Sequence, residues 1–542
     1  LKVGNYCPAS QSDVSTYQNL LFVSAEGNTG RIDCGDQGVK DTVSTERIRG
    51  LRIFDISDIS HPRNLANVQT CRGSHTHSVL VDPKDPDNVY VYISGSAPPR
   101  SPSEMSGCFA DKDDPNTAEF RIEVIKVPLA HPEQAAIIAS PRIFNNLTPV
   151  SSHGGAPEDL VADAAAKANG AFVAMVFGRE TVLSTFRTQP LLDSIAAAHG
   201  RTVATAADSA ELRTGIQAWA NRRYGTGEAN PRRPGVTSCH DITLYPGIGM
   251  AGGACEGYGL LIDIKDPAHP ARIGAVADSN FSYWHSATFN NDGTKILFSD
   301  EWGGGGQPKC RASDPHQWGA DALFTIENGK MQFQGYYKMP APQTKEENCV
   351  AHNGSLIPIP GRDVMVQAWY QGGISVFDWT DAAHPKEIAF FDRGPVDSTR
   401  MSMGGSWSVY WYNGVMVSSE IARGLDIFEL APSAYLSRNE IDAAKTVHFD
   451  YLNTQGQPHL VWPASFALAR AYADQLERGG GLASDRITAA RRALSAAEKA
   501  SGAARKDALT RLAAQLDQDA AGAGDAAKVR LLSKAVRDLG GM

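Results

Sequence analysis

The sequence contains no apolar run long enough to cross a membrane. Its apolar runs stay well below the roughly 18 residues that a membrane helix needs, so no spanning segment is predicted. An excess of positive charge is also missing, because the formal net charge of the 542 residues is -9. The longest basic stretch, within 222–233, is broken by acidic residues and glycines. We therefore expect neither nucleic acid nor an anionic membrane as a partner.

Paired cysteine motifs and common catalytic signatures are absent too. None of the eight cysteines belongs to a CxxC pair, and the chain has no GxSxG or HExxH motif. Dispersed cysteines in even number favour disulfides over a zinc knuckle, with reduced buried thiols as the alternative. Cys239 and Cys255 flank adjacent predicted strands and could be bridged, and other pairings stay open. Disulfides predict a periplasmic, cell-surface or secreted protein.

The N-terminus carries no visible signal peptide. Leu1 opens within "LKVGNY", which is typical of a strand, and there is no initiator Met. We therefore expect that a segment before Leu1 has been removed. The length and the 42% of hydrophobic residues predict one large domain with at least one smaller one.

One phrase recurs along the chain and indicates the fold. Each copy is an apolar run that ends in Asp or a related residue and is closed by a turn with proline, which is the pattern of a strand and its stop signal. The copies are Gly50–Pro62, Phe120–Pro132, Gly259–Pro270, Gly373–Pro385 and, more loosely, Gly424–Ser433. These lines resemble the LVIVD repeat, which builds propeller blades in secreted bacterial proteins. The resemblance implies a β-propeller over residues 1-435 and implies no particular activity.

In each unit another repeated strand precedes the recurring phrase. A further apolar run lies soon after that preceding strand and before the phrase. The preceding strand begins near Ser12, Thr76, His240, Trp284, His352 and Ser406. Six blades are thus visible, and "LKVGNY" would supply the outer strand of another. We predict an all-β propeller with about seven blades, six being the alternative.

Two regions break the repeat and show helical periodicity. The segment 150-235 predicts a helical insertion in the propeller, and the Ala-rich segment 463-542 predicts a small C-terminal helical bundle after a linker at 436-462. The bundle is similar in layout to the FIMAH-type helical domains at the ends of secreted bacterial proteins. That similarity implies no activity.

Candidate functional residues gather where the first strand of each blade begins and the second ends, because in a propeller both points face the same mouth. Long connections at 27–49, 95–119, 302–320 and 144–238 are predicted over that mouth. Imidazole and carboxylate suit Cu, Zn or Fe. We predict His77, His240, His285 and His352 as metal ligands, with Glu301 or Asp241 as ligand or general base. Hydrogen bonding among these groups around the channel, without a metal, is the alternative.

Other polar features have structural interpretations. His61, His131, His269 and His384 all occupy the turn after the repeat strand, so we expect turn packing and exclude them as ligands. Glu26 and Glu420 each precede an Arg, Arg49 and Arg423, which favours ion pairs within a blade. Turns at 82–88 and 290–294 have part of a calcium-ligand pattern, but neither has the full ladder of an EF-hand. Aromatic residues such as Trp284, Trp369 and Trp407 favour core packing over a sugar or aromatic site.

Three functions are consistent with these features. The first is an extracytoplasmic propeller that binds protein or glycan of the cell envelope through its His-rich, long-loop face, and the sequence alone favours it slightly. The second is a metal-dependent enzyme, redox or hydrolytic. The third is a structural subunit of a surface assembly, as a homo-oligomer or within a larger complex.

Overall fold

The computed structural model describes residues 12–541 except 112–113, 115, 120, 149–152, 177–178 and 225–236, together with Cys7 and Ala9. The chain forms two compact units. The first contains Leu1–Asn145, Thr237–Ala312 and His316–Met542, and the second contains Asn146–Val236 with Ser313–Pro315.

Six antiparallel sheets build the first unit, and each takes its strands in sequence order. The first two blades contain β1 (Val14–Tyr17), β2 (Leu20–Ala25), β3 (Gly50–Asp55), β4 (Arg63–Gln69), β5 (Thr76–Val81), β6 (Asn88–Ser94), β7 (Glu123–Pro128) and β8 (Ala136–Ala139). The third and fourth contain β11 (Asp241–Tyr245), β12 (Met250–Cys255), β13 (Tyr258–Asp263), β14 (Ala271–Val276), β15 (Trp284–Phe289), β16 (Lys295–Asp300), β17 (Asp321–Glu327) and β18 (Lys330–Tyr337). The last two contain β19 (Gly354–Ile357), β20 (Val364–Ala368), β21 (Ile374–Asp378), β22 (Lys386–Phe391), β23 (Ser406–Tyr412), β24 (Val415–Glu420) and β25 (Gly424–Phe428).

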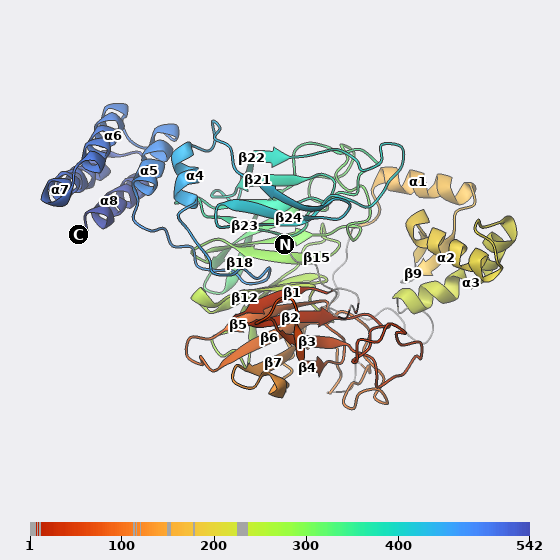
Figure 1. Cartoon of the computed structure of the whole chain (residues 1–542). Helices are drawn as coiled ribbons and strands as arrows, with labels where there is room; N and C mark the ends of the chain where they lie inside the picture. The colour runs from red at the N-terminus through yellow and green to blue at the C-terminus, as the bar shows by residue number, and fades with distance from the viewer. Residues whose placement is uncertain are drawn as a thin grey trace. The chain divides into compact units, whose positions relative to one another are not determined.

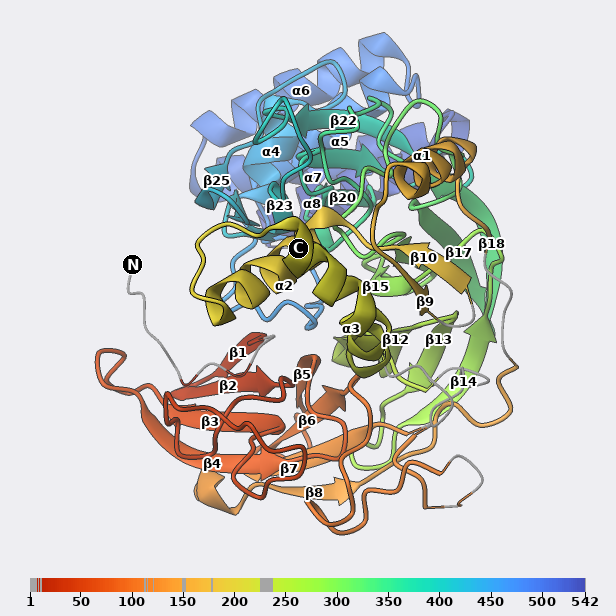
Figure 2. The same ribbon diagram turned by 90° about the vertical axis from the view of Figure 1, so that its right-hand side faces the viewer.

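The described residues form six blades, which is the alternative that the sequence left open and not the seven that it favoured. Each of the six sheets of the first unit corresponds to one repeat unit visible in the sequence. The seventh depended on "LKVGNY", and Leu1–Tyr6 lie outside the described residues. In Figure 2 the first strands of the blades face the centre, and outer strands such as β4, β14 and β18 lie at the periphery.

The hydrophobic core lies between neighbouring blades. Apolar side chains of β2 and β3 pack with those of β5, β6 and β7, as Phe22, Ile53 and Val91 show. Equivalent clusters join the third blade to the fourth, the fourth to the fifth and the fifth to the sixth. Successive side chains of a strand point to opposite faces, so a strand whose sheet packs against a blade on each side carries apolar residues on both faces.

Residues 449–462, which we call the crossing segment, bind the ends of the first strands. Asn453 exchanges two hydrogen bonds with the backbone of Thr16 in β1. Gln455 and Gln457 pair through their backbones with Leu244 in β11. The Gln457 amide pairs with both backbone groups of Phe289 in β15, and Trp462 donates to Pro358 after β19. Because first strands begin at one mouth and end at the other, the crossing segment covers the mouth opposite the predicted site.

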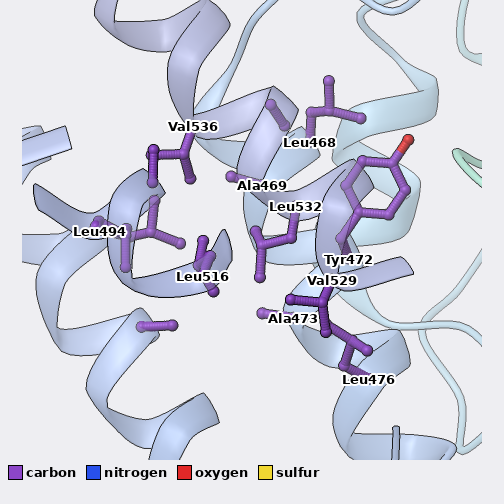
Figure 3. Packing of buried hydrophobic residues seen from close by; sticks show 14 of the residues in the cluster. Leu468, Ala469, Tyr472, Ala473, Leu476, Leu494, Leu516, Val529, Leu532 and Val536 are labelled. Carbon is purple, nitrogen blue, oxygen red and sulfur yellow. The ribbon is translucent and has the colours of Figure 1, made fainter. Parts of the chain in front are cut away.

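The C-terminal bundle is present, as the helical periodicity predicts. It contains α5 (Phe466–Arg478), α6 (Ser484–Lys499), α7 (Gly502–Asp519) and α8 (Ala526–Gly540), after α4 (Arg438–Ala444). Figure 1 shows these helices in blue, and Figure 3 shows Leu468, Tyr472, Leu494, Leu516 and Leu532 meeting in their core.

A buried carboxylate attaches the bundle to the fifth blade. Glu440 in α4 is fully buried and accepts hydrogen bonds from Arg362 of the propeller at 2.9 Å and from Arg478 of α5 at 2.6 and 2.9 Å. The two guanidinium groups, together with the Ser437 N–H, hold the pKa of this carboxyl below its usual value although burial alone would raise it. Removing one partner of such a buried group costs about 3–5 kcal/mol.

The second unit has its own small core. It contains α1 (Pro157–Ala168), β9 (Val173–Val176), β10 (Arg179–Val182), α2 (Thr185–Ala198) and α3 (Ala206–Tyr224). Ala174, Val176, Leu212, Ile216 and Ala220 form most of its buried cluster. The insertion is helical, as the sequence predicts. Its described residues form three helices and also a two-stranded hairpin, which the sequence does not predict.

All eight cysteines form disulfides. The pairs are Cys7–Cys34, Cys71–Cys108, Cys239–Cys255 and Cys310–Cys349. The pairing of Cys239 with Cys255 is confirmed, and the alternative of reduced thiols is wrong. Four disulfides indicate an oxidising, extracytoplasmic compartment. Within the described part of the chain, every helix is too short or too polar to span a bilayer.

Candidate functional site

A cavity of about 870 Å³ opens where the first strands begin. All six blades contribute to its lining, through residues such as Asp13, Thr76, His240, His285, His352 and Trp407. This volume is within the range of small-molecule sites. The prediction that first-strand starts meet at one mouth is therefore confirmed for these residues, and of the predicted second-strand ends Glu301 lines the same cavity.

Four imidazoles form an arc along the blade-two to blade-five side of the cavity. The Nε2 atoms of His75 and His240 lie 2.8 Å apart. The ring centroids of His240 and His285 are 3.8 Å apart, and those of His285 and His352 are 4.1 Å apart. Each histidine comes from a different blade, so only the closed ring of sheets brings residues 75 to 352 together.

Glu301 lies opposite two of these rings, directly after β16. Its Oε2 is 3.8 Å from His285 Nε2, and its Oε1 is 3.8 Å from His352 Nε2. The Tyr370 hydroxyl donates to Oε1 at 2.6 Å and so holds the carboxylate in place. One donor atom each from His285, Glu301 and His352 lies within 4.8 Å of the others, and a second group of this kind contains His240, Asp241 and His285.

Two carboxylates orient the first two imidazoles of the arc, those of His75 and His240. Glu26 Oε2 lies 2.8 Å from His75 Nδ1, and Asp241 Oδ1 lies 3.1 Å from His240 Nδ1. Both contacts use Nδ1 and leave Nε2 directed away from the carboxylate. In metal proteins, an acidic group on one imidazole nitrogen commonly orients the other nitrogen toward the ion.

Burial keeps the imidazoles of His285 and His352 neutral. It lowers the pKa of His352 to about 3 and, with the nearby imidazoles of His240, His352 and His75, lowers the pKa of His285 well below 6.5. A hydrogen bond with the Asn353 side chain at His285 and with the Trp407 backbone at His352 acts in the opposite direction, but burial outweighs it. Neutral imidazole is the form that binds metal ions.

The acidic groups in and next to the cavity have pKa values that are shifted in different directions. Burial raises the pKa of Glu301 and raises the pKa of Asp13 to about 7. Burial acts on Glu26 in the same direction, but the hydrogen bond and charge of His75 outweigh it and lower the pKa of Glu26 to about 2. Glu26 and His75 are therefore a charged pair, whereas Glu301 retains a proton more readily.

The other predicted site residues lie outside the cavity lining. His77 is fully buried between blades one and two, where its Nδ1 lies 2.8 Å from the Ser24 hydroxyl. Asp241 is also buried, behind His240, and accepts a hydrogen bond from Asn353. The structure thus places His240, His285, His352 and Glu301 together, places Asp241 beside them as an orienting group, and separates His77.

The remaining polar residues make local contacts, most of them of the kind that the sequence predicts. In three of the four turn histidines, His61, His269 and His384, Nδ1 contacts an Asp three residues earlier at 2.8–2.9 Å, and all three are exposed. Glu420 pairs with Arg423, as expected, whereas Glu26 binds His75 and Ser96. In the turns considered for calcium, Asp82 and Asp292 accept hydrogen bonds within their own turns.

Two contributors were not among the predicted ligands. His75 lies just before β5, so the backbone enters the strand only after it, and its ring reaches the cavity while His77 points between blades. Tyr370 is the second residue after β20 and has a left-handed backbone (φ 53°), and its hydroxyl donates to Glu301. The position of Tyr370 after a second strand, like that of Glu301, is the signal that could have identified it.

The glycine run after Trp302 packs against this pair. Gly303, Gly304 and Gly305 all have left-handed backbones, at φ 85°, 63° and 65°. A Cβ on Gly305 would lie 2.1 Å from the Tyr370 hydroxyl oxygen and 2.9 Å from Glu301 Oε1. The loop at 303–305, interpreted from sequence as a lid element, therefore also leaves room for the Tyr370–Glu301 contact.

Comparisons with known proteins give structural similarity only. No protein-family profile and no curated protein matches the sequence. A periplasmic gluconolactonase of Pseudomonas aeruginosa shares 12% identity over 84% of this chain and 88% of its own, with a TM-score of 0.41. A protein from Lactobacillus plantarum shares 11% over 78% and 80%, with a TM-score of 0.38. The hydrazine synthase of Kuenenia stuttgartiensis shares 8% over 77% and 81%, with a TM-score of 0.36.

Proposed function

We propose that this chain is an extracytoplasmic metal-dependent enzyme whose centre is formed by His285, His352 and Glu301. The supporting observation is that one carboxylate faces two neutral imidazoles at 3.8 Å, on the wall of a cavity large enough for a substrate. Two imidazoles and one carboxylate leave coordination positions open, which is the arrangement of catalytic rather than structural metal sites.

The donor set favours a transition metal, namely Cu, Zn or Fe. Imidazole suits all three, whereas calcium takes oxygen ligands almost exclusively. His240 lies next to His285 and is the next donor along the arc, with Asp241 as its orienting group. The 3.8 Å separations of Glu301 from His285 Nε2 and His352 Nε2 are too long for hydrogen bonds, and the pKa values of both imidazoles are depressed. Hydrogen bonding alone would require neither cost.

The chemistry divides between the ion and the side chains. A bound ion would polarise a substrate oxygen or lower the pKa of a bound water. Tyr370 holds Glu301 in position, Glu26 orients His75, and Asp241 orients His240. A zinc ion in this set would serve hydrolysis, and iron or copper would serve oxidation, so the identity of the metal decides the reaction class.

Elemental analysis tests the proposal. The protein, purified from the oxidising compartment without added metal, should hold about one equivalent of a transition metal, as expected for one three-ligand site. His285→Leu should lose it, whereas His269→Ala, which removes a turn histidine of the neighbouring blade, should keep it. A metal-free wild-type protein that also fails to bind added Zn, Cu or Fe would contradict the proposal.

The binding and assembly functions have less structural support. A non-catalytic propeller that captures protein or glycan of the cell envelope needs no depressed imidazole pKa values, and the contacts described here do not indicate a partner. It remains a prediction, as do the homo-oligomer, the larger assembly and the relation to the LVIVD and FIMAH families. Native mass measurement would decide whether the chain assembles.

A further inference from the structure

The cavity has a second side that the metal centre does not use. Blades two to five contribute the four histidines, whereas blades six and one contribute Trp407, Ser408 and Tyr410 on one hand and Ser12, Asp13 and Val14 on the other. Trp407 occupies the same place in β23 that His285 occupies in β15, one residue into the innermost strand. The two sides therefore differ in chemistry at equivalent positions of the fold.

Trp407 is exposed where comparable tryptophans are buried. Its exposed fraction is 45%, against 0% for Trp284 and Trp369, which are core residues as expected. Its ring lines the cavity, and its centroid lies 6.2 Å from that of His352. An indole left open toward a cavity offers a flat apolar face on which a ring can stack. A ring stacked there would lie next to the proposed metal ligands.

A half-buried amide lies beside this indole. Asn353 pairs in register with Ser408, the residue after Trp407. Its Nδ2 donates to Asp241, its side chain also hydrogen-bonds to His285, and the residue lines the cavity. These contacts fix a polar amide on the cavity wall next to Trp407.

The rest of the lining is polar but poor in charge. Its described residues include no Lys or Arg. Hydroxyls and amides make up much of it, from Ser12, Thr76, Ser282, Ser419, Thr454 and Gln455. Such groups both donate and accept, which matches a ligand whose own hydroxyls do both. An anionic ligand would meet no side-chain cation with a full charge on this side.

We propose that the cavity binds a neutral sugar, with one face of the pyranose ring on Trp407 and its hydroxyls on the polar residues of the lining. The stacked face uses the apolar C–H surface of the sugar, and the hydroxyl-rich lining satisfies its edge. This assignment names the substrate class for the proposed enzyme and in that sense rests on the proposed function, but the binding itself needs no metal.

Calorimetric titration of the full chain tests the assignment. The probes are methyl glucoside, methyl galactoside and cellobiose as neutral sugars, gluconate as an anion, choline as a cation and catechol as a plain arene. At least one neutral sugar should bind more tightly than the other three probes. Trp407→Ala should weaken it by about tenfold or more, and Trp407→Phe should restore part of the loss. Phe390→Ala, an exposed ring on the outer strand β22, should have no effect.

Metal content measured on the same samples separates this inference from the proposed function. Trp407→Ala should retain the metal of the wild type. Sugar binding that depends on Trp407 in a metal-free protein would support this inference while the metal centre fails. A metal-containing protein that binds catechol, choline or gluconate in preference to every sugar, or binds none of the probes at millimolar concentration, would overturn the inference and leave the metal centre standing.

Discussion

The two mouths of the channel are built from opposite ends of the same strands, and they treat polar groups differently. At the mouth covered by the crossing segment, Gln457 and Asn453 each pair with both backbone groups of a strand residue. At the other mouth, Glu301 faces His285 Nε2 and His352 Nε2 beside an open cavity at 3.8 Å, which is too long for a hydrogen bond. Folding alone favours full pairing, so the unpaired end is where a ligand would repay the cost.

Removing a proposed ligand should have the largest effect at the unpaired mouth. We expect His285→Leu to weaken metal binding by more than about 100-fold, because even groups that only orient a ligand are worth about 10–100-fold. Its unfolding free energy should stay near that of the wild type, since leucine strands no buried nitrogen. Metal titration and chemical denaturation measure the two quantities. Metal binding equal to that of wild type would contradict the assignment.

A substitution at the mouth covered by the crossing segment should lower the unfolding free energy and leave the metal content unchanged. Gln457→Ala removes the partners of the Phe289 N–H and C=O, and each buried group left unpaired costs about 1–3 kcal/mol. We expect a loss of about 2–5 kcal/mol in the unfolding free energy at unchanged metal content. Gln332→Ala, on an exposed position of β18, is the matched control. A loss of metal in Gln457→Ala would break the distinction between the mouths.

The orienting carboxylates should give a smaller effect on metal affinity. Asp241→Asn keeps the shape of the side chain but removes the charge beside His240 Nδ1, so we expect metal affinity to fall by about 10–100-fold. Asp266→Asn makes the same change in the exposed Asp–His pair of the third blade and should leave affinity unchanged. Equal behaviour of the two variants would show that His240 is not a ligand.

Competition between a proton and the metal for Glu301 should give the smallest effect on metal affinity. The raised pKa of Glu301 means that the carboxyl keeps its proton to higher pH, whereas His285 and His352 stay neutral well below their ordinary pKa. A metal must displace that proton, so affinity should fall, by at most about tenfold per unit, as the pH drops through the pKa of Glu301. Glu301→Gln should bind more weakly but with a flatter profile between about pH 8 and about pH 5. A decline that is equally steep in Glu301→Gln would assign the proton to another group.

Much of the site could be predicted because the repeat places equivalent residues at equivalent points. His240, His285, His352 and Glu301 were identified from strand starts and ends alone, and the cavity contains all four. His77 was chosen where His75 reaches the cavity: both His77 and His285 are the second residue of a first strand, yet His285 lines the cavity and His77 is buried between blades. No local pattern in the sequence distinguishes those cases.

The crossing segment shows the other limit of sequence reasoning. Residues 436–462 have little periodicity and were predicted as a linker, yet they form hydrogen bonds with blades one, three, four, five and six. Such pairing depends on partners more than 100 residues away, which a local pattern does not encode. The blade count was uncertain for a similar reason, since a repeat gives the units but not how many complete the ring.

By itself the sequence determined the units: strands that alternate, turns that stop them, helices with an apolar stripe and an even set of cysteines. Those properties are local, because they follow from side-chain size, polarity and backbone preference over a few residues. Only the tertiary structure decided which imidazoles share a cavity, which carboxylate faces them and which tryptophan is exposed. Those properties depend on the closure of six sheets around one axis, which brings residues separated by hundreds of positions within a few ångströms.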